Sequence, residues 1–391
     1  MSTTNRHSDK FEIPLLGTLV RYKRGCKFPE KSMTPVTVVS TLNSGGTERV
    51  ALNLHNQLIE VFPNSLLIVL LATVKPADKI QNVIYLDGKN VFSSIINFLA
   101  LYRKIKYEKK LVIFSFSEYS NSIISLLKTC KFINGPVILR ASTVLTKKFE
   151  EAGRLRKRIS TLLYASADVI VCQSETIRSD FIERFKIPAE KLVIIHNPAL
   201  NSQDYRVRPA NHEDYDLSNS KPYVVCVGNM RKEKGQARLV ELYKKSGCRH
   251  NLVFAGSGAE ADRLARIVDF YKLHDRIKII GGTVDTIPLI AGAKALIIPS
   301  YYEGYPNVAV DAAFLGIPII GFSDCEVLSE IVSDGVNGYI CNYSEPNSFV
   351  IAVERSCDLK PYNPQTQLLC ARHQPKTFLA KYLQVAEKLS E

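Results

Sequence analysis

The stretch ALIIPSYYEGYPNVAVDAAFLG, residues 295–316, combines a strand, a loop and a helix start. Residues 295–299 are apolar and partly β-branched, as in a buried parallel strand. Residues 307–315 have helix composition after Pro306 and are closed by Gly316. A helix that begins just after a strand ends presents backbone N–H groups and its positive dipole end to that edge of the sheet. The pattern therefore favours a phosphate at this edge.

Two acidic side chains flank the expected site. Glu303 lies in the loop and Asp311 about one turn into the helix, so both carboxylates are placed to accept hydrogen bonds from hydroxyl groups. Sugars and ribose carry such hydroxyls on either side of a diphosphate. The alternative needs no ligand: Glu303 is then a loop surface residue, and Asp311 a partner of the helix dipole.

The spacing of these acids resembles the E-x7-E segment of the family 4 retaining glycosyltransferases of the GT-B fold, with Pro-Ser before it and Gly-Ile-Pro after it. In that family the first acid contacts the transferred sugar and the second holds the ribose. The resemblance implies these roles for Glu303 and Asp311, although Asp311 is one methylene shorter than the usual Glu. It also implies donor contacts from the loop and the helix start, at Tyr305, Asn307 and Val308.

A second loop, Gly228 to Gly235, follows the strand 223–227 and resembles the family's G-R-L-x-x-x-K-G loop, whose cations neutralise the diphosphate of the donor. Lys234 is in register with the Lys of that motif. Asn229 occupies the Arg position, and Arg231 is the candidate replacement. Without a ligand, a basic turn of this kind is a solvated loop.

Glycine loops follow two further strands. Gly45 and Gly46 come after the strand 36–40 and match the family's G-G-x-E-R loop, which reaches the donor diphosphate and the acceptor. Gly256 and Gly258 come after the strand that begins at Asn251, in a loop that borders base and phosphate in the family. Neither loop is specific by itself, because glycine is common in strand-to-helix turns.

Other polar residues carry weaker signals. Arg140 stands where many relatives have a His-Asp pair, and it is a candidate to hold a diphosphate oxygen or an acceptor hydroxyl. A surface ion pair is the alternative. His196, beside Asn-Pro, is interpreted as hinge structure, and the D-x-D spelling at 214–216 follows no strand and is interpreted as linker.

The chain of 391 residues, 46% hydrophobic, is long enough for two cores. Strands alternate with helices, which predicts an α/β fold with parallel sheets. The resemblance extends this to GT-B, with two doubly wound Rossmann-like domains that face each other across a cleft. The expected segments are an extension 1–34, an acceptor-side domain 35–200, a linker 201–220, a donor-binding domain 221–372 and a helix 373–391 packed across both domains.

The nine cysteines are scattered singly, without C-x-x-C pairs or His clusters, which predicts reduced thiols and no metal site. The polar start of the chain shows no secretory pattern, and no apolar run approaches the about 20 residues of a membrane span. We therefore expect a cytoplasmic protein, with a nucleotide-diphosphate sugar as co-substrate and neither metal nor cofactor.

The net charge of +13 is concentrated in the N-terminal half of the chain, because residues 101–160 carry 14 Lys or Arg against 4 Asp or Glu. Nucleic-acid motifs are absent, so we expect no nucleic-acid partner. The segment 95–110 is amphipathic at its start and basic at its end, as in helices that bind the cytosolic face of an anionic membrane. An ordinary packed helix with a solvated basic end is the alternative.

The resemblance implies a hexosyl- or N-acetylhexosaminyltransferase acting on a glycan or lipid-linked saccharide, in cell-surface polysaccharide or lipopolysaccharide biosynthesis. Retention is implied by the resemblance alone. One alternative is a catalytically silent subunit that binds sugar nucleotides or polysaccharide. Another is a nucleotide-sugar epimerase, or a phosphorylase, on the same scaffold, although no acid–base or pyridoxal-lysine constellation stands out.

Overall fold

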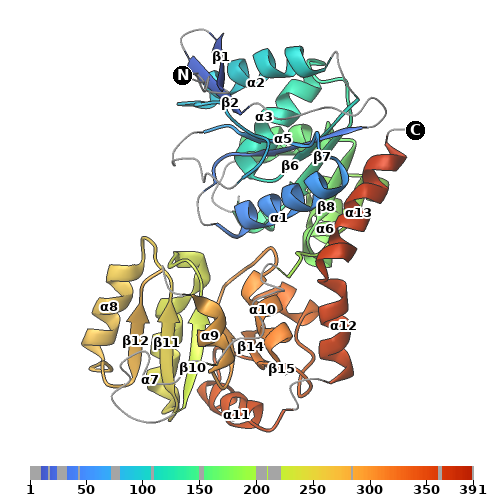
Figure 1. Ribbon diagram of the computed structural model, residues 1–391. Helices are drawn as coiled ribbons and strands as arrows, with labels where there is room; N and C mark the ends of the chain where they lie inside the picture. The colour runs from blue at the N-terminus through green and yellow to red at the C-terminus, as the bar shows by residue number, and fades with distance from the viewer. Residues whose placement is uncertain are drawn as a thin grey trace, which may run out of the picture. The chain divides into compact units, whose positions relative to one another are not determined.

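The computed structural model describes residues 10–15, 18–23, 33–42, 45–71, 80–106, 110–148, 154–199, 209, 222–282, 285–359 and 363–389. The chain divides into two compact units, each built on its own sheet (Figure 1). Unit 1 contains residues 1–173, 177–195 and 379–391, and unit 2 contains 174–176 and 196–378. The expected linker 201–220 and the D-x-D spelling lie outside the described residues, apart from Pro209.

Unit 1 contains a sheet whose strand order is β1-β2-β5-β4-β3-β6-β7-β8-β9. From β5 to β9 every neighbouring pair is parallel, and the order reverses at β3, as in doubly wound folds. The parallel strands are β3 (Thr34–Val39), β4 (Leu66–Val69), β5 (Val83–Tyr85), β6 (Leu111–Ser115), β7 (Val137–Ala141), β8 (Val169–Cys172) and β9 (Leu192–Ile194). The predicted strand 36–40 is thus confirmed as β3, with small differences at its ends.

Helices cover both faces of this sheet. Apolar side chains of α2, α3, α5 and α6 join the strands in one core cluster, and Tyr382 of α13 packs against Phe114 of β6. The helices of the unit are α1 (Gly46–Val61), α2 (Val91–Ile105), α3 (Glu118–Thr129), α4 (Leu145–Lys148), α5 (Arg154–Ala165) and α6 (Glu175–Phe185), with the 3-10 turn η1 (Ala189–Lys191). The loop that contains Gly45 leads from β3 into α1, which confirms the predicted strand, glycine loop and helix.

The expectation of an irregular extension over residues 1–34 is wrong for part of it. β1 (Lys10–Leu15) and β2 (Thr18–Lys23) form an antiparallel pair, and β2 pairs with β5 through Arg21 and Tyr85. These segments alternate apolar and polar residues over short runs, which suits an edge strand better than a coil. β3 already begins at Thr34.

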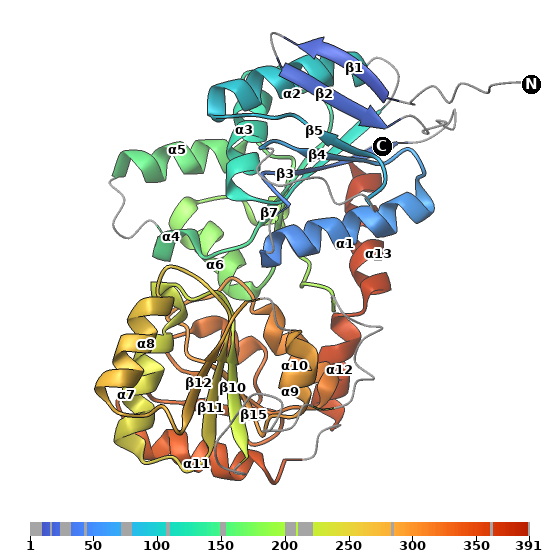
Figure 2. The ribbon, with the colours of Figure 1, turned by 60° about the vertical axis from the view of Figure 1, so that its left-hand side comes forward.

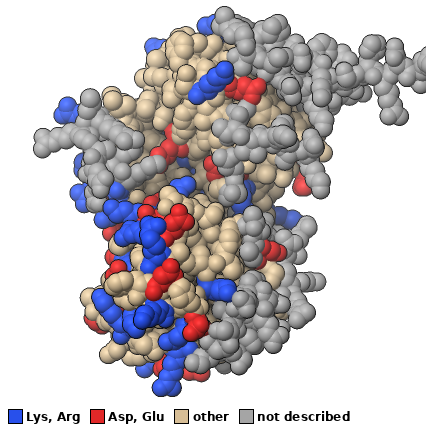
Figure 3. Space-filling model, turned by 90° about the vertical axis from the view of Figure 1, so that its left-hand side faces the viewer, with Lys and Arg blue, Asp and Glu red and all other residues tan. Residues whose placement is uncertain are grey.

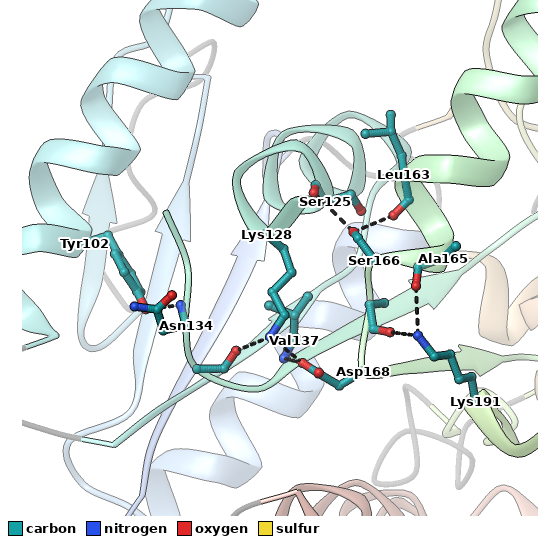
Figure 4. A network of polar contacts seen from close by, with 12 residues as sticks. Tyr102, Ser125, Lys128, Asn134, Val137, Leu163, Ala165, Ser166, Asp168 and Lys191 are labelled. Atoms are coloured by element: carbon teal, nitrogen blue, oxygen red, sulfur yellow. Dashed lines mark hydrogen bonds and ion pairs between the residues drawn. The ribbon is translucent and has the colours of Figure 1, made fainter. Parts of the chain in front are cut away.

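Ser166 and Asp168, just before β8, belong to a polar network at the amino ends of β7 and β8 (Figure 4). Asp168 accepts a hydrogen bond from Val137 N at 2.8 Å and pairs with Lys128 Nζ at 2.9 Å. The hydroxyl of Ser166 donates to Ser125 O at 3.1 Å and to Leu163 O at 2.7 Å. Ligands of doubly wound sheets bind at the opposite, carboxyl ends of the strands, so this network supports the fold.

Helix α2 shows how the first part of segment 95–110 is packed, which bears on its two interpretations. Asn90 caps the helix with a reciprocal capping box to Ser93, and Phe98 and Leu101 are buried in the core of unit 1. The apolar face is therefore packed, as expected for an ordinary helix. The described basic residues at its end are exposed at Arg103, Lys104 and Lys110 and half-buried at Lys106.

Unit 2 contains a parallel sheet of order β12-β11-β10-β13-β14-β15, which reverses between β10 and β13. Its strands are β10 (Tyr223–Val227), β11 (Asn251–Ala255), β12 (Ile277–Ile280), β13 (Leu296–Ile298), β14 (Ile319–Phe322) and β15 (Gly338–Cys341). This strand order is the doubly wound order predicted for the donor domain.

The side chains of β10 alternate between two cores: Val224 and Cys226 face one, and Tyr223 and Val225 face the other. α7 and α8 lie on one side of the sheet and α9, α10 and α12 on the other (Figure 2). The helices and turns are η3 (Lys232–Lys234), α7 (Gln236–Ser246), α8 (Ala261–Phe270), α9 (Thr286–Ala291), α10 (Asn307–Leu315), η4 (Glu326–Glu330), α11 (Pro346–Ser356), α12 (Pro364–Arg372) and α13 (Pro375–Lys388).

The chain passes from unit 1 to unit 2 between Ile195 and His196 and returns within α13, after Phe378. The last helix was expected from residue 373, and α13 contributes to both units, its first turn to unit 2 and the remainder to unit 1. None of the described helices is long and apolar enough to cross a bilayer.

The buried imidazole of His55 on α1 predicts acid sensitivity of unit 1. Its Nε2 lies 2.9 Å from Gln81 O, and its Nδ1 has no hydrogen-bond partner among the described residues. Burial lowers the pKa of His55 from 6.5 to about 4, although the bond to Gln81 raises it in part. Protonation would place a buried cation here.

Between pH 6.5 and about 4 the unfolded chain binds a proton at His55 that the folded chain does not. Neutral His55 therefore does not reduce the free energy of unfolding above pH 6.5. As the pH falls through that window, the free energy of unfolding decreases by about 3 kcal/mol in all. Urea unfolding at pH 7 and pH 4.5 measures this loss. His55→Leu should show a flatter pH dependence than the wild type, and the exposed control His274→Gln the same dependence. Identical slopes for all three proteins would refute the assignment.

Candidate functional site

The candidate site lies at the carboxyl ends of β10 and β13, where the strand order of unit 2 reverses. β10 and β13 are parallel neighbours, paired through Val225 and Leu296. From β10 the chain continues to β11 on one side of this pair, and from β13 it continues to β14 on the other side. In open α/β sheets this reversal leaves a crevice in which ligands bind. The loops 228–235 and 299–306, singled out from the sequence, both start at this point.

Lys234 and Glu303 meet here. Lys234 Nζ lies 2.6 Å from Glu303 Oε1 and 2.7 Å from Oε2, and the Ser300 hydroxyl donates to Oε1 at 2.6 Å. The lysine side chain is 29% exposed and the glutamate side chain 10%. The two residues are far apart in the sequence, and the prediction that both lie at the same edge of the sheet is confirmed. The pair places one cation and one carboxylate side by side in a partly dry environment.

The two loops approach each other too closely for a side chain at Gly235. Its φ is +67°, and a Cβ there would lie 2.1 Å from Pro299 O. Tyr301 N donates to Glu233 O at 2.9 Å, and this hydrogen bond joins the two loops next to the residues of the ion pair. The Lys-Gly order of the motif thus has a steric reason: the glycine lets the turn that carries Lys234 come against β13.

Arg238 on α7 supports this arrangement, and no sequence motif indicates it. Its guanidinium donates to Pro299 O at 2.8 Å and to Ser300 O at 2.9 Å, and it also pairs with Asp324. The guanidinium carbon lies 4.0 Å from the ring centroid of Tyr301. Arg238 is buried, so it fixes the strand end from which Ser300 reaches Glu303. Arg238 belongs to α7, and only the folded arrangement places it beside the end of β13.

The glycines of the neighbouring loops pack backbone against backbone. A Cβ on Gly256 would lie 2.0 Å from Gly228 O, and one on Gly258 would lie 2.3 Å from Met230 O. Met230 N also donates to Ser257 O at 2.8 Å. The three glycines therefore belong to one layer of loops above β10 and β11, and their contact with a donor stays a prediction.

Helix α10 begins beside this layer. Pro306 is its N-cap and offers no side-chain hydrogen bond, and the predicted helix bounds are confirmed from Asn307 to Leu315. Tyr305 is buried, while Asn307 and Val308 are half-buried. Asp311 is only 5% exposed, on the first turns of the helix. Unit 2 thus brings together Lys234, Glu303 and the start of α10, and the ribose contact of Asp311 stays a prediction.

Arg231 does not join the ion pair. Its side chain is 63% exposed, and its NH1 lies 4.0 Å from Glu233 Oε1. Asn229, in the Arg position of the motif, is exposed and accepts a hydrogen bond from Gln236 Nε2 at its backbone oxygen. The expectation that Arg231 supplies a second cation finds no support in these contacts and stays a prediction.

Arg140 is held by contacts within unit 1, and the ligand contact that we expected stays a prediction. It is 1% exposed, and its NH1 donates to Tyr382 OH at 2.8 Å and to Ile195 O at 3.3 Å, all within unit 1. Gly45 and Gly46 also belong to unit 1, where the Glu48 carboxylate fills the space beside Gly45.

Cys226 lies on β10, the strand that leads into the loop of Lys234. Burial raises its pKa to about 12, against the opposing effect of Lys234. A thiol so protonated is a poor nucleophile and a poor metal ligand. Within the described ranges, no three His, Cys, Asp or Glu side chains lie close enough together to hold a metal ion. The expected independence from metal stays a prediction.

Two family models match the chain. The model for glycosyl transferases group 1 covers residues 207–365, and the model for glycosyltransferase family 4 covers residues 44–199. The first match contains the ion pair and α10, and the second contains the glycine loop before α1.

Curated relatives and solved structures agree with these models. An uncharacterized glycosyltransferase of Haemophilus influenzae is 23% identical over 347 residues, 83% of this chain and 89% of the relative. A Campylobacter jejuni N-acetylgalactosaminyltransferase, named for its diphospho-undecaprenol acceptor, is 23% identical over 50% of this chain and 52% of its own length. Anabaena Alr3699/HepE, solved in complex with UDP-glucose, superposes with a TM-score of 0.72 at 16% identity, over 91% of this chain and 99% of that structure.

Two doubly wound α/β sheets, the site at the strand-order reversal and these matches lead to one conclusion. The chain belongs to the group 1, family 4 type glycosyltransferases and has the GT-B fold.

Proposed function

We propose that this glycosyltransferase takes its sugar from a nucleotide-diphosphate donor and transfers it, with retention, to a lipid-linked saccharide or glycan of cell-surface polysaccharide or lipopolysaccharide biosynthesis. A hexose or an N-acetylhexosamine is the sugar we expect. One observation carries the donor part of the proposal: Lys234 and Glu303 form a close ion pair at the strand-order reversal of unit 2.

The pair suits a reaction in which a diphosphate leaves a sugar. As the glycosidic bond breaks, negative charge grows on the leaving diphosphate, and a fixed ammonium stabilises that charge. Lys234 Nζ supplies it, and the backbone N–H groups at the start of α10 add a favourable dipole. In this proposal no metal ion is needed, because protein groups provide the positive charge.

Glu303 has two functions in this proposal. Its carboxylate neutralises Lys234 while the site is empty, and it accepts hydrogen bonds from sugar hydroxyls once the donor is bound. Ser300 holds one carboxylate oxygen and so limits how the group can rotate. Asp311 is assigned to the ribose hydroxyls.

A direct assay distinguishes the transferase from its alternatives. Nucleotide-diphosphate sugars are screened first by thermal shift, and release of nucleoside diphosphate is then measured with and without acceptor. A transferase releases nucleoside diphosphate faster when acceptor is present. A silent binding subunit shifts the melting temperature and releases none above background, while an epimerase converts the sugar without release.

The acceptor class rests on relatives. The Campylobacter protein is named for a sugar carried on diphospho-undecaprenol, and polyprenyl carriers are confined to membranes. We infer a lipid-linked acceptor for this chain as well, which requires the enzyme to work at a bilayer surface. A glycan acceptor free of lipid is the alternative, and the assay distinguishes them if both kinds of acceptor are supplied.

A basic surface on unit 1 would hold the enzyme at such a bilayer. The residues concerned are Arg103, Lys104, Lys106, Lys109 and Lys110, of which Lys109 lies outside the described residues. Val91 and Phe92, at the start of α2, are 51% and 72% exposed. In unit 2, by contrast, basic and acidic residues alternate on the face that carries α8 (Figure 3). Anionic lipid attracts each nearby Lys or Arg by about 1 kcal/mol.

We predict that the protein sediments with anionic vesicles at low salt, that high salt weakens this binding, and that neutral vesicles bind less. A variant with the five basic residues changed to Gln should lose most of the binding. A matched control changes basic residues of unit 2, such as Arg263 and Arg266 on α8, and should keep it. Equal partitioning to both vesicle types would leave the basic residues without this role.

A further inference from the structure

The loop between Glu303 and α10 is held by side chains from two distant parts of unit 2. The Tyr305 hydroxyl lies 2.9 Å from His373 Nε2, at the end of α12. His373 Nδ1 in turn contacts the backbone oxygen of Asn197. The rings of Tyr305 and His373 are 5.3 Å apart, and His373 is fully buried. No sequence motif indicates a role for His373.

These partners fix the tautomer of His373. A backbone oxygen only accepts hydrogen bonds, so Nδ1 carries the proton that is donated to Asn197 O. In the neutral imidazole Nε2 is then bare and accepts from the Tyr305 hydroxyl. Burial raises the pKa of Tyr305, which keeps that hydroxyl a donor.

Asn197 closes the network from the other side. Its Nδ2 donates to Tyr305 O at 3.4 Å and to the side-chain oxygen of Asn307, the first residue of α10. Both the side chain and the backbone of Tyr305 are thus held. The last loop residues before α10 have little freedom left.

We propose that His373 is a positioning residue of the donor site: through Tyr305 and Asn197 it sets the course of the loop between Glu303 and the N-terminus of α10. The inference rests on the proposed function, because the loop needs this precision only if it binds a donor.

Packing alone does not require these polar groups. Tyr305 belongs to an apolar core cluster with side chains of α9 and α10, and a phenyl ring would fill much the same space. A buried polar network in such surroundings costs desolvation and gains orientation in return. The loop that it orients carries Glu303 at one end and Asn307 at the other.

Three variants separate the two contacts of His373. Tyr305→Phe removes only the hydroxyl. His373→Gln places an amide near the position of Nε2 and keeps an acceptor for Tyr305, while His373→Asn keeps only a donor for Asn197. Tyr223→Phe is the matched control, because its buried hydroxyl donates to Leu289 O at 2.8 Å, at the amino end of β10 and away from the site.

Binding of UDP and of GDP is measured by calorimetry, together with the melting temperature and, once a donor is known, kcat and KM. We expect Tyr305→Phe and His373→Asn to raise the Kd of the nucleotide that binds by about tenfold, as for one lost buried hydrogen bond. His373→Gln should stay within about threefold of the wild type on the same grounds. Tyr223→Phe should lower the melting temperature and leave Kd unchanged.

Two results overturn the inference. One is an unchanged Kd and kcat in folded Tyr305→Phe and His373→Asn, which would make the network structural only. The other is a 15N spectrum of the wild type that shows the proton of His373 on Nε2, a measurement that needs no variant to fold. If the wild type binds neither UDP nor GDP nor any donor of the screen, the proposed function fails first, and the spectrum still reports the network separately.

Discussion

Lys234→Ala is expected to lower kcat by about 10- to 1,000-fold, because one charge-assisted contact to the leaving group is worth about 2 to 4 kcal/mol in the transition state. The Kd of the donor should change much less. The diphosphate gains most of its extra charge as the bond breaks, so the ammonium stabilises the transition state more than the bound donor.

The ion pair gives a second reason for this difference. Lys234 Nζ is bonded to both oxygens of Glu303, so a donor diphosphate competes with a carboxylate for the same cation. The contact of Lys234 with the bound donor therefore adds less to donor affinity, because the donor must displace the carboxylate from the ammonium. Removing Lys234 removes the competition along with the contact.

The control is Lys232→Ala, an exposed lysine in the same 3-10 turn. It changes the net charge equally and should leave kcat near that of the wild type. The assays are run with and without EDTA, because a chelator should have no effect if protein groups supply the positive charge. Near-full turnover of Lys234→Ala at saturating donor would show that another group stabilises the diphosphate.

Glu303→Gln and Asp311→Asn are expected to differ from each other. Glu303→Gln should lower kcat by about 10- to 100-fold, the value of a hydrogen bond to a charged group, and tighten the binding of free nucleoside diphosphate because Lys234 is released. Asp311→Asn should weaken donor binding by about fivefold or more, with a smaller effect on kcat, because ribose lies away from the reacting bond.

Both substitutions keep the shape of the side chain, which matters at the largely buried Asp311. The two effects are read from kcat and from calorimetric Kd values for nucleoside diphosphate. Small and equal changes in both variants would return the acids to the alternative set out from the sequence, a surface loop residue and a helix-dipole partner.

Most of the fold could be predicted because its signals are local. The strands of both sheets are short apolar runs bounded by turn residues, and α10 has a Pro before it and a Gly after it. The residues Lys234 and Glu303 were also predictable, because each directly follows a parallel strand and such strand ends meet at one edge. The N-terminal strands were missed, since two short edge strands differ little from a polar coil.

The supporting residues could not be predicted from the sequence alone. Arg238, Asn197 and His373 reach the site from a helix interior, an inter-element segment and the end of α12. Their partners lie far away in the chain, and no spacing rule connects them. The place of Arg140 at a strand end indicated a ligand; the structure adds contacts to Tyr382 and the Ile195 backbone that no spacing rule announces, and the ligand contact stays a prediction.

The pairing of Arg140 with Tyr382 bears on how the protein is made. Arg140 lies on β7 of the unit 1 sheet, yet its phenolic partner is synthesised only after the whole of unit 2. A nascent chain that has just completed β9 therefore lacks the hydroxyl that accepts from Arg140 in the finished unit. Unit 1 must wait for α13 to leave the ribosome before its interior is complete, whereas residues 196–378 emerge as one uninterrupted run. Synthesis order thus makes unit 2, the later-made part, the first that can finish folding.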